Sequence, residues 1–469
     1  MTSLSRFTTA LANPRTRTVA SSDPLTITEN PALIGATAIA AGTNLDFTSG
    51  LIRPVRGRGT LQGGTNFNVD QLHRDGTNPT SVEPTGFEVL YTGRYFEFCF
   101  SSEGQRYHIW VDGVLSKSSG YLSVAADSTY HFTLIDFGSR AAAGRRIRIE
   151  MQGSKPFGYI RRETSESLLN PAPVRPCNML LVGDSFHEPS FPTYKIDGIP
   201  TLLGEKLGVD NVIPSASGGT GFSAGNLGAG KANFAQRIVK EVTLYPASDP
   251  AIDVVLFCAS GNDAFNVGAP YATLAEWQAG YTTDVNFCLS TARTAWPGAV
   301  ILVMSHAQPQ GGLGTDGAFK EGALAAACPT YGARWIGGLP DAILASPGYA
   351  TWYHADGHPN DLGHAGISSL MNTLIRSIIF VSSASVQSLF KDKLPYAASL
   401  NARLAEFFLS VGASPSLVSD YFRDSVPYAL SFDERIALVL TSLGKSPALF
   451  GGRKTHAATF AQRLEEAFA

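Results

Sequence analysis

The tripeptide Gly183-Asp184-Ser185 is the first feature of the sequence with a chemical use, because it stops the apolar run LLV at 180–182. A serine at the end of a strand can attack an ester once a nearby base removes its proton. Gly183 would leave room for the approaching substrate. Gly-Asp-Ser is also an ordinary turn sequence, so the tripeptide alone leaves both interpretations open.

Two later motifs could donate hydrogen bonds to the negative oxygen that forms during such an attack. The loop SGGTG at 217–221 follows the apolar segment VDNVI. Because its glycines have no side chain, their backbone N–H groups are open to a bound oxyanion. The motif Ser260-Gly261-Asn262-Asp263 ends the run AIDVVLFCA, where the Asn262 amide could donate and Asp263 could hold the loop. A flexible glycine-rich loop and a common turn are the alternatives.

A base could come from the segment YHADGHPNDLGH at 353–364, which precedes an apolar helix expected to run to about Phe380. A serine nucleophile needs an imidazole within hydrogen-bond reach, and the imidazole needs a carboxylate that holds its tautomer. The segment offers both groups. Metal binding is the alternative use of these histidines, but no Cys or carboxylate cluster matches them, so we expect no metal and no cofactor.

These motifs must be positioned by a parallel sheet. After the proline-rich joint NPAPVRP at 170–176, short apolar segments alternate with helical segments expected at about 197–207, 231–244 and 272–293. Near-continuous apolar strands separated by helices predict a parallel sheet covered on both faces. Sites in such sheets form at the carboxyl ends of the strands, where each motif falls.

The segment before this domain alternates apolar and polar residues from about 46 to 165, which predicts an antiparallel, jelly-roll-like β-sandwich with a hairpin turn at Asp112-Gly113. Residues 1–45 have weak periodicity and are expected to form an arm or linker followed by short strands. The sandwich could bind carbohydrate if its aromatic side chains form a stacking surface, although core positions are favoured for them. The aromatic residues are Tyr107, Trp110, Tyr121 and Tyr130.

The last part of the chain, 381–469, contains an internal repeat. The segment FKDKLPYAASLNARLAEFFLSVGASPSL at 390–417 recurs as FRDSVPYALSFDERIALVLTSLGKSPAL at 422–449. Each unit has the pattern of a helix, a Gly stop and a Ser-Pro restart, and a single unit cannot bury its own apolar stripe. We expect the units to stack on each other, on the catalytic domain, or on another chain in a homo-oligomer or larger assembly.

Composition excludes several classes of protein. The chain has 469 residues, 44% of them hydrophobic, and a net charge of -3, so no global charge draws it toward nucleic acid or anionic membrane. Five cysteines without C-x-x-C spacing suggest neither a disulfide framework nor a structural zinc site. No signal peptide or membrane-spanning run is recognisable, so we expect a soluble protein, cytoplasmic or released by lysis or virion assembly.

Taken together, the four motifs resemble those of the SGNH hydrolases, the GDSL esterase and lipase family, over residues 174–380. The resemblance implies a three-layer, flavodoxin-like α/β fold. It also implies Ser185 as nucleophile and His358 as general base, with an oxyanion hole formed by the N–H groups of Ser185 and Gly218 and the amide of Asn262. Where the family usually has Gly at the start of the third motif, this chain has Ser260.

The fourth family motif, D-x-x-H, has two imperfect matches here. Asp356 and His358 are too close together, but His358 is followed by Pro-Asn and then Gly363, as is usual after the catalytic His of the family. Asp361 and His364 have the literal spacing, but His364 falls where the following helix should start. We favour Asp356 and His358.

A β-sandwich ahead of such a domain resembles the arrangement in carbohydrate esterases. The sequence therefore predicts an esterase that removes O-acyl, chiefly O-acetyl, groups from a glycan, and no apolar stretch suggests a lipid-binding lid. Two alternatives stay open. The chain could be an O-acetyltransferase of the same fold, or a glycan-binding or deacetylating module of a phage tail or surface assembly.

Overall fold

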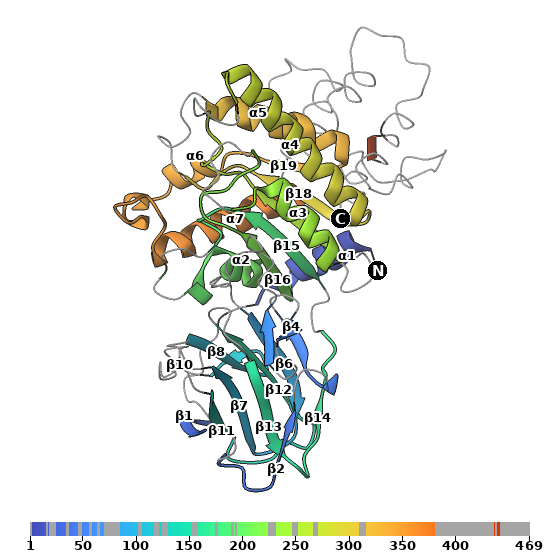
Figure 1. The fold of residues 1–469 in the computed structure, drawn as a ribbon, viewed down its shortest axis with the longest axis vertical. Coiled ribbons are helices and arrows are strands. Elements are labelled where there is room, and N and C mark those ends of the chain that lie inside the picture. Colours follow the sequence, from blue (N-terminus) through green and yellow to red (C-terminus); the bar gives the residue numbers. More distant parts are fainter. Residues whose placement is uncertain are drawn as a thin grey trace, which may run out of the picture.

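The computed structural model has an antiparallel β part and a parallel α/β part, stacked along the long axis of the molecule (Figure 1). It describes most residues from 2 to 379, together with 436, 439 and 440. The residues left undescribed are 1, 16, 18–24, 34–36, 46–48, 56–58, 63–65, 70–84, 102–105, 117–121, 124–129, 152–156, 174–176, 189–191, 193–194, 224–230, 246–251, 266–270, 309–315, 380–435, 437–438 and 441–469. The predicted C-terminal repeat therefore lies almost wholly outside the described residues.

The α/β part is built on a five-stranded sheet in which every neighbouring pair is parallel, as the apolar runs predict. The strand order is β16-β15-β17-β18-β19, so the chain pairs its second strand on one side of the first and its third strand on the other. This is the strand order of flavodoxin-like folds. The strands are β15 (Asn178–Gly183), β16 (Asn211–Ala216), β17 (Val254–Cys258), β18 (Val300–Met304) and β19 (Arg334–Ile336).

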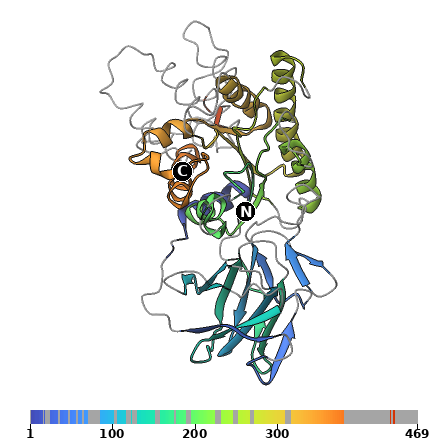
Figure 2. The same ribbon diagram turned by 60° about the vertical axis from the view of Figure 1, so that its left-hand side comes forward.

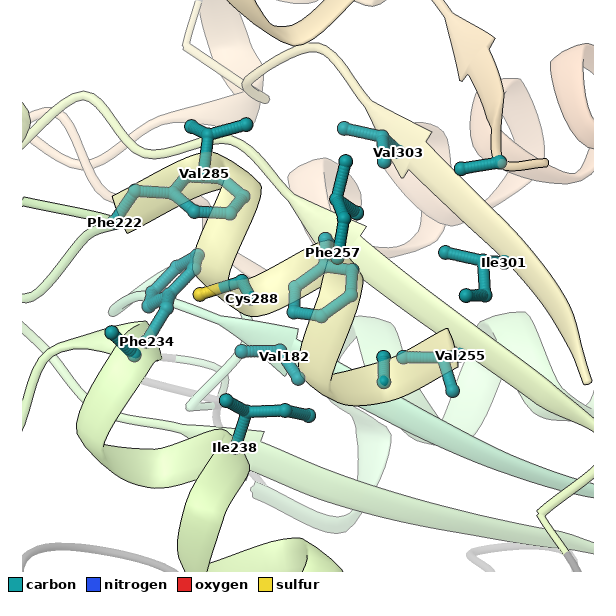
Figure 3. Close-up of a cluster of buried hydrophobic side chains, with 14 of the residues drawn as sticks. Val182, Phe222, Phe234, Ile238, Val255, Phe257, Val285, Cys288, Ile301 and Val303 are labelled. Carbon is teal, nitrogen blue, oxygen red and sulfur yellow. The ribbon is translucent and has the colours of Figure 1, made fainter. Parts of the chain in front are cut away.

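Helices pack on both faces of this sheet (Figure 2). Leu180 and Val182 of β15 face one cluster of buried apolar side chains, whereas Met179 and Leu181 face the other. The first cluster, shown in Figure 3, is covered by α3 (Phe234–Leu244), α4 (Leu274–Ala295) and α5 (Gly317–Ala327). The second is covered by α2 (Ile199–Leu207), α6 (Leu339–Leu344) and α7 (Asp361–Ile379). The described residues also include the short 3-10 helices η3 (Lys195–Asp197), η5 (Cys328–Tyr331) and η6 (Tyr349–Trp352).

The β part consists of two antiparallel sheets whose inner faces share one apolar core. The first has the order β1-β11-β7-β13-β5-β4, with β2 paired to β13. The second has the order β10-β8-β12-β6-β14, with β3 on β6 and β9 on β8. Asp112 and Gly113 both have positive φ, 50° and 85°, as a type I′ hairpin turn requires. The strands are β1 (Thr26–Leu33), β2 (Gly42–Leu45), β3 (Arg53–Val55), β4 (Gly59–Gln62), β5 (Asn66–Val69), β6 (Thr85–Tyr91), β7 (Tyr95–Ser101), β8 (Arg106–Val111), β9 (Val114–Leu115), β10 (Leu122–Ser123), β11 (Tyr130–Asp136), β12 (Arg145–Met151), β13 (Phe157–Glu163) and β14 (Leu168–Leu169).

The N-terminal segment contributes to both parts, whereas the sequence predicted an arm or linker followed by short strands. β1 and β2 precede residue 46 yet belong to the sandwich. Helix α1 (Ser3–Ala12) packs on the α/β part, where its Phe7 and Leu11 lie in the same cluster as α2 and α7. The contact is close, because a Cβ on Gly208 would stand 2.1 Å from the carbonyl oxygen of Ala10. Residues 3–12 are therefore part of the core of the α/β part.

The predicted aromatic surface of the sandwich is not formed by Tyr107 and Trp110, which are 0% and 1% exposed. Trp110 instead lies at the junction of the two parts, where its indole N–H donates to Glu150 (3.1 Å) and Arg15 covers its ring at 5.0 Å. Tyr107 lies in the core of the sandwich, whereas Trp110 is buried outside that core. Tyr121 and the side chain of Tyr130 lie outside the described residues.

All five cysteines are buried and free. Among the helices that the structure describes, none is both long and apolar enough to cross a membrane.

Candidate active site

Ser185 lies just beyond the carboxyl end of β15, the strand from which the sheet extends in both directions. In open parallel sheets this switch point is where ligands bind, because the loops after the flanking strands diverge there. A tight turn follows the strand, in which the carbonyl of Asp184 accepts the N–H groups of His187 (3.0 Å) and Glu188 (2.9 Å). The turn leaves Ser185 partly exposed at the sheet edge.

The imidazole of His358 meets the serine hydroxyl. His358 Nε2 lies 3.0 Å from Ser185 Oγ, a hydrogen-bond distance. On the other side of the ring, Nδ1 lies 3.4 Å from Asp356 Oδ2, which is longer than an ordinary N–H···O bond. The structure thus brings together the three residues that the sequence favours as nucleophile, base and carboxylate.

The short spacing between Asp356 and His358 is accommodated by a tight turn. Gly357, with φ of 84°, donates its N–H to the carbonyl of His354 (2.9 Å), and the chain then folds back on itself. The His358 N–H donates to Asp356 Oδ1 (3.1 Å), and this bond lowers the pKa of the exposed carboxyl. Two residues are therefore enough to bring a carboxylate back to the imidazole.

The residue after the nucleophile supports the ring of the base. Phe186 is 3% exposed, and its ring centroid lies 5.7 Å from that of His358 and 6.5 Å from that of Tyr353. Because the phenyl ring fills the space beneath the imidazole, it restricts the orientations that His358 can adopt. Phe186 thus packs directly against the proposed base.

The other histidines named from the sequence have different surroundings. His364 is fully buried on α7, where its Nδ1 accepts the N–H of Ile199 (3.3 Å). His354 is exposed and donates its backbone N–H to the carbonyl of His358 (2.9 Å). His187 is 1% exposed, and its Nδ1 lies 3.2 Å from Asp184 Oδ1. Asp361 is exposed at the first position of α7.

Gly218 lies beside the nucleophile, as the predicted oxyanion site requires. A Cβ at this position would stand 3.2 Å from Ser185 Cβ, so only glycine allows so close an approach without displacing a neighbour. Lys231 Nζ donates to the carbonyl oxygen of Gly218 (2.5 Å). The Gly218 N–H itself donates to a carboxylate oxygen of Glu188.

Asn262 is held at the same edge of the sheet through Ser260. Its Nδ2 donates to Ser260 Oγ (3.0 Å) and to the carbonyl of Thr220 (3.2 Å), and its backbone N–H also donates to Ser260 Oγ (3.0 Å). Ser260 Oγ lies 2.8 Å from Asp184 Oδ2, next to the nucleophile in the chain. The serine that replaces the usual glycine is therefore a hydrogen-bonding centre that connects the first and third motifs.

A buried ion pair lies under the nucleophile turn. Asp184 Oδ1 accepts the N–H of Phe186 (3.0 Å) and lies 3.2 Å from His187 Nδ1. Burial opposes the ionised carboxyl, but its hydrogen-bond donors outweigh burial and lower the pKa of Asp184. For His187, burial lowers the pKa, but Cys258 and the carboxylate raise it to about 10. Each partner therefore favours the charged form of the other.

Arg237 of α3 ties two of the motif loops together. It is 0% exposed, and its Nη2 donates to the carbonyl of Gly183 (2.7 Å) and to Thr220 Oγ1 (3.1 Å). Its Nη1 donates to the carbonyl of Ser215. One guanidinium thus holds the ends of β15 and β16 at a fixed separation, which sets the distance between the loops of Ser185 and Gly218.

Asp263 holds a loop, as expected, but the loop is the one after β16. Its carboxylate accepts the N–H groups of Phe222 (3.0 Å) and Ser223 (2.8 Å). Burial raises the pKa of Asp263 to about 6, although these donors and the nearby Lys320 favour the carboxylate. Lys320 donates to the carbonyl of Asp263 (2.7 Å).

Sequence reasoning missed Glu188, Arg237 and Lys320. Glu188 is three residues after the nucleophile, and that proximity was the one available signal for it. Arg237 and Lys320 lie on helices far from any motif, and the patterns of these helices give no sign that a cation is buried. Among the described residues, no group of three His, Cys, Asp or Glu side chains is placed to hold a metal ion.

Comparison with known proteins identifies the class of fold. No protein-family model and no curated protein matches the sequence. A solved carbohydrate esterase matches with a TM-score of 0.50 and 15% identity, over 70% of this chain and 97% of its own. A salicylyl-acyltransferase from a tetracycline biosynthetic pathway matches with a TM-score of 0.51 and 10% identity, over 72% of this chain and 98% of its own. A family two carbohydrate esterase from Cellvibrio japonicus has a TM-score of 0.49 and 14% identity, over 72% of this chain and 97% of its own.

The chain therefore shares a fold with carbohydrate esterases and with an acyltransferase. This confirms, at the level of the fold, the resemblance that the four motifs predicted.

Replacing Asp356 by Asn is expected to reduce kcat by only about tenfold, against about 10⁴-fold for the buried aspartate of a serine protease triad. The reason is exposure: the Asp356 side chain is 47% exposed and 3.4 Å from the ring, and solvent screens its interaction with an imidazolium. Steady-state kinetics on a soluble acetyl ester measure the change. A loss of a thousandfold or more would mean that Asp356 is as important as a buried triad carboxylate.

Proposed function

We propose that this chain is a serine esterase that hydrolyses O-acyl groups, chiefly O-acetyl groups, on a carbohydrate. The observation that carries the proposal is the 3.0 Å contact between His358 Nε2 and Ser185 Oγ at the switch point of the sheet. A serine beside a histidine that is itself beside a carboxylate is the arrangement used for acyl transfer. Glycine at 218 adds a backbone donor next to the nucleophile.

In the first half of the reaction, His358 Nε2 takes the proton of Ser185 as Oγ attacks the acyl carbon. Asp356 favours the resulting imidazolium. The tetrahedral intermediate then expels the sugar oxygen, which receives the proton from His358, and the acyl group remains on Ser185. In the second half, water gives its proton to His358 and attacks the acyl-enzyme, which releases the acid and restores the serine.

The oxyanion of each tetrahedral intermediate is proposed to accept hydrogen bonds from the N–H groups of Ser185 and Gly218 and from the Asn262 amide. The support for Gly218 is its close approach to Ser185. The support for Asn262 is its position beside Ser260, which is bonded to the residue before the nucleophile. Because Asn262 Nδ2 donates to Ser260 Oγ and to the Thr220 carbonyl, its bond to the oxyanion would replace one of these two bonds. Hydrogen-bond donors that point at the developing negative charge lower the barrier, because they stabilise the transition state more than the ground state.

Replacing Asn262 by Ala is expected to lower kcat by about 10²- to 10³-fold with a much smaller change in KM, because an oxyanion donor acts mainly in the transition state. Measurement of kcat and KM on an acetyl ester tests this. The Ser260→Gly variant is the matched comparison, since it keeps the amide but removes its anchor, and a smaller loss is expected. An Asn262→Ala enzyme with unchanged kcat would remove this residue from the proposed oxyanion hole.

The substrate class is supported by the fold shared with a carbohydrate esterase and by the absence of an apolar stretch suited to a lipid-binding lid. Acetate release from acetylated xylan, together with turnover of p-nitrophenyl acetate and none of p-nitrophenyl palmitate, is the expected pattern. Cleavage of the long-chain ester alone would favour a lipase and contradict the proposal.

An acyltransferase is the second candidate, because the salicylyl-acyltransferase has a comparable TM-score. It would use the same acyl-Ser185 intermediate, with a hydroxyl group in place of water as the acceptor. Incubation with an acetyl ester and a free sugar separates the two functions: acetate as the main product supports the esterase, and acetylated sugar as the main product supports the transferase.

A further inference from the structure

The carboxylate of Glu188 accepts a hydrogen bond from the Gly218 N–H, which is one of the donors proposed for the oxyanion. Its Oε2 accepts the N–H of Gly218, and the same oxygen lies 3.0 Å from the position of a Cβ on that glycine. That position is only 3.2 Å from Ser185 Cβ, so the carboxylate oxygen and the nucleophile lie on the same side of the Gly218 peptide. The oxygen of Glu188 therefore stands where a substrate oxyanion would bind.

Glu188 is buried, and its backbone is held in position by a hydrogen bond. The residue is 6% exposed, and its backbone N–H is fixed to the carbonyl of Asp184 (2.9 Å) within the nucleophile turn. Ser185 and Glu188 are thus carried by the same turn, and only side-chain torsions can move the carboxylate away from Gly218. The turn itself is anchored below by Asp184 and His187.

Two negative oxygens that approach the same N–H repel each other, so binding of one opposes binding of the other. For the proposed reaction to proceed, the Glu188 carboxylate must leave the Gly218 N–H before or while the tetrahedral intermediate forms. A buried carboxylate that loses a donor incurs a free-energy cost unless a new donor replaces it. The substrate itself can supply that donor if it carries a hydroxyl group near the ester.

We infer that Glu188 is a specificity-determining residue: it covers the oxyanion donor until a hydroxyl group of a polyhydroxylated ester draws its carboxylate away. This inference rests on the proposed esterase function and deepens it. In a sugar acetate, a free hydroxyl next to the ester can donate to the Glu188 carboxylate. This bond replaces the one that the carboxylate loses when it leaves the Gly218 N–H. A simple alkyl or aryl acetate brings no donor, so it must displace Glu188 without compensation and reacts slowly.

The experiment compares kcat/KM for p-nitrophenyl acetate, which has no hydroxyl group, with kcat/KM for a mono-O-acetylated methyl pyranoside. In Glu188→Ala the rate on p-nitrophenyl acetate is expected to rise about tenfold or more, because a charge-assisted hydrogen bond no longer competes. The rate on the sugar acetate is expected to stay unchanged or fall. Glu188→Gln, which keeps the shape but removes the charge, is expected to change the ratio in the same direction by a smaller factor.

Glu163→Ala is the matched control, since Glu163 Oε2 also accepts two backbone N–H groups, those of Arg94 (3.0 Å) and Tyr95 (3.1 Å), but within the sandwich. Its ratio of rates should equal that of the wild type. Glu188 variants that change both rates by the same factor, or that lower both, overturn the inference.

The double variant Ser185→Ala, Glu188→Ala distinguishes the esterase proposal from the inference about Glu188. Turnover of both p-nitrophenyl acetate and the sugar acetate should vanish in it. Turnover that survives there counts against the esterase proposal, whereas an unaltered ratio in the single variant counts against Glu188 alone.

Discussion

Replacing Ser185 by Ala is expected to lower kcat on an acetyl ester by about 10⁴-fold or more while the protein stays folded. The hydroxyl is the atom that would become acylated, so no covalent intermediate can form without it. In a well-studied serine protease the loss of the nucleophile costs about 10⁶-fold in kcat. The fold should survive because Ser185 is partly exposed and the turn that carries it is closed by backbone bonds to Asp184.

The measurement is steady-state turnover of p-nitrophenyl acetate, paired with thermal unfolding of the same sample. Ser369→Ala is the control, because the hydroxyl of this half-buried serine of α7 donates to the carbonyl of Ala365 within its own helix (2.8 Å). It should leave both turnover and Tm unchanged. Full turnover in Ser185→Ala would place the reaction elsewhere and would contradict the esterase proposal.

The sequence contained enough to predict the sheet and the edge at which the site lies. β15, β16, β17 and β18 are buried along nearly their whole length, so each appears as a short apolar run that ends at a Gly- or Ser-containing motif. A parallel sheet requires the ends of these runs to meet. β19 was not predicted because it has only three residues, RWI, and two of them are only partly buried.

What the sequence did not reveal depends on contacts between distant segments. The alternating pattern around Trp110 is that of a sandwich strand and does not show what covers its side chain. In the structure Arg15 and Glu150 cover it at the junction with the α/β part. Helix α1 is short, and its apolar residues are buried only because α2 and α7 are present. The position of Glu188 depends on Gly218, thirty residues away. No local pattern encodes such contacts.

The fourth motif shows how spacing can mislead when a turn intervenes. The family spacing D-x-x-H fits Asp361 and His364, but α7 begins at Asp361, and a helix fixes the direction of both side chains. The shorter pair, Asp356 and His358, works because positive φ at Gly357 reverses the chain between them. A residue count therefore says less about the contact between a carboxylate and an imidazole than the conformation of the loop does.

Replacing His358 by Ala is expected to lower kcat by about 10⁴-fold or more, while the corresponding change at His364 leaves kcat within a few-fold of the wild type. His358 Nε2 is the base within reach of Ser185 Oγ, and a serine hydroxyl is a weak nucleophile at neutral pH without one. His364 is fully buried, and its Nδ1 accepts the N–H of Ile199 (3.3 Å). Its loss should appear in the free energy of unfolding, by about 1–3 kcal/mol, because that N–H is left without its acceptor.

The two histidine variants control for each other when kcat, KM and unfolding are measured at one pH on the same acetyl ester. The expected pattern is opposite in the two readouts: low kcat with near-normal stability for His358→Ala, and near-normal kcat with reduced stability for His364→Ala. Stability is affected less at 358 because its side chain is 27% exposed at the rim. If His364→Ala alone abolishes turnover in a folded protein, the base is His364, and the contact between His358 and Ser185 has another role.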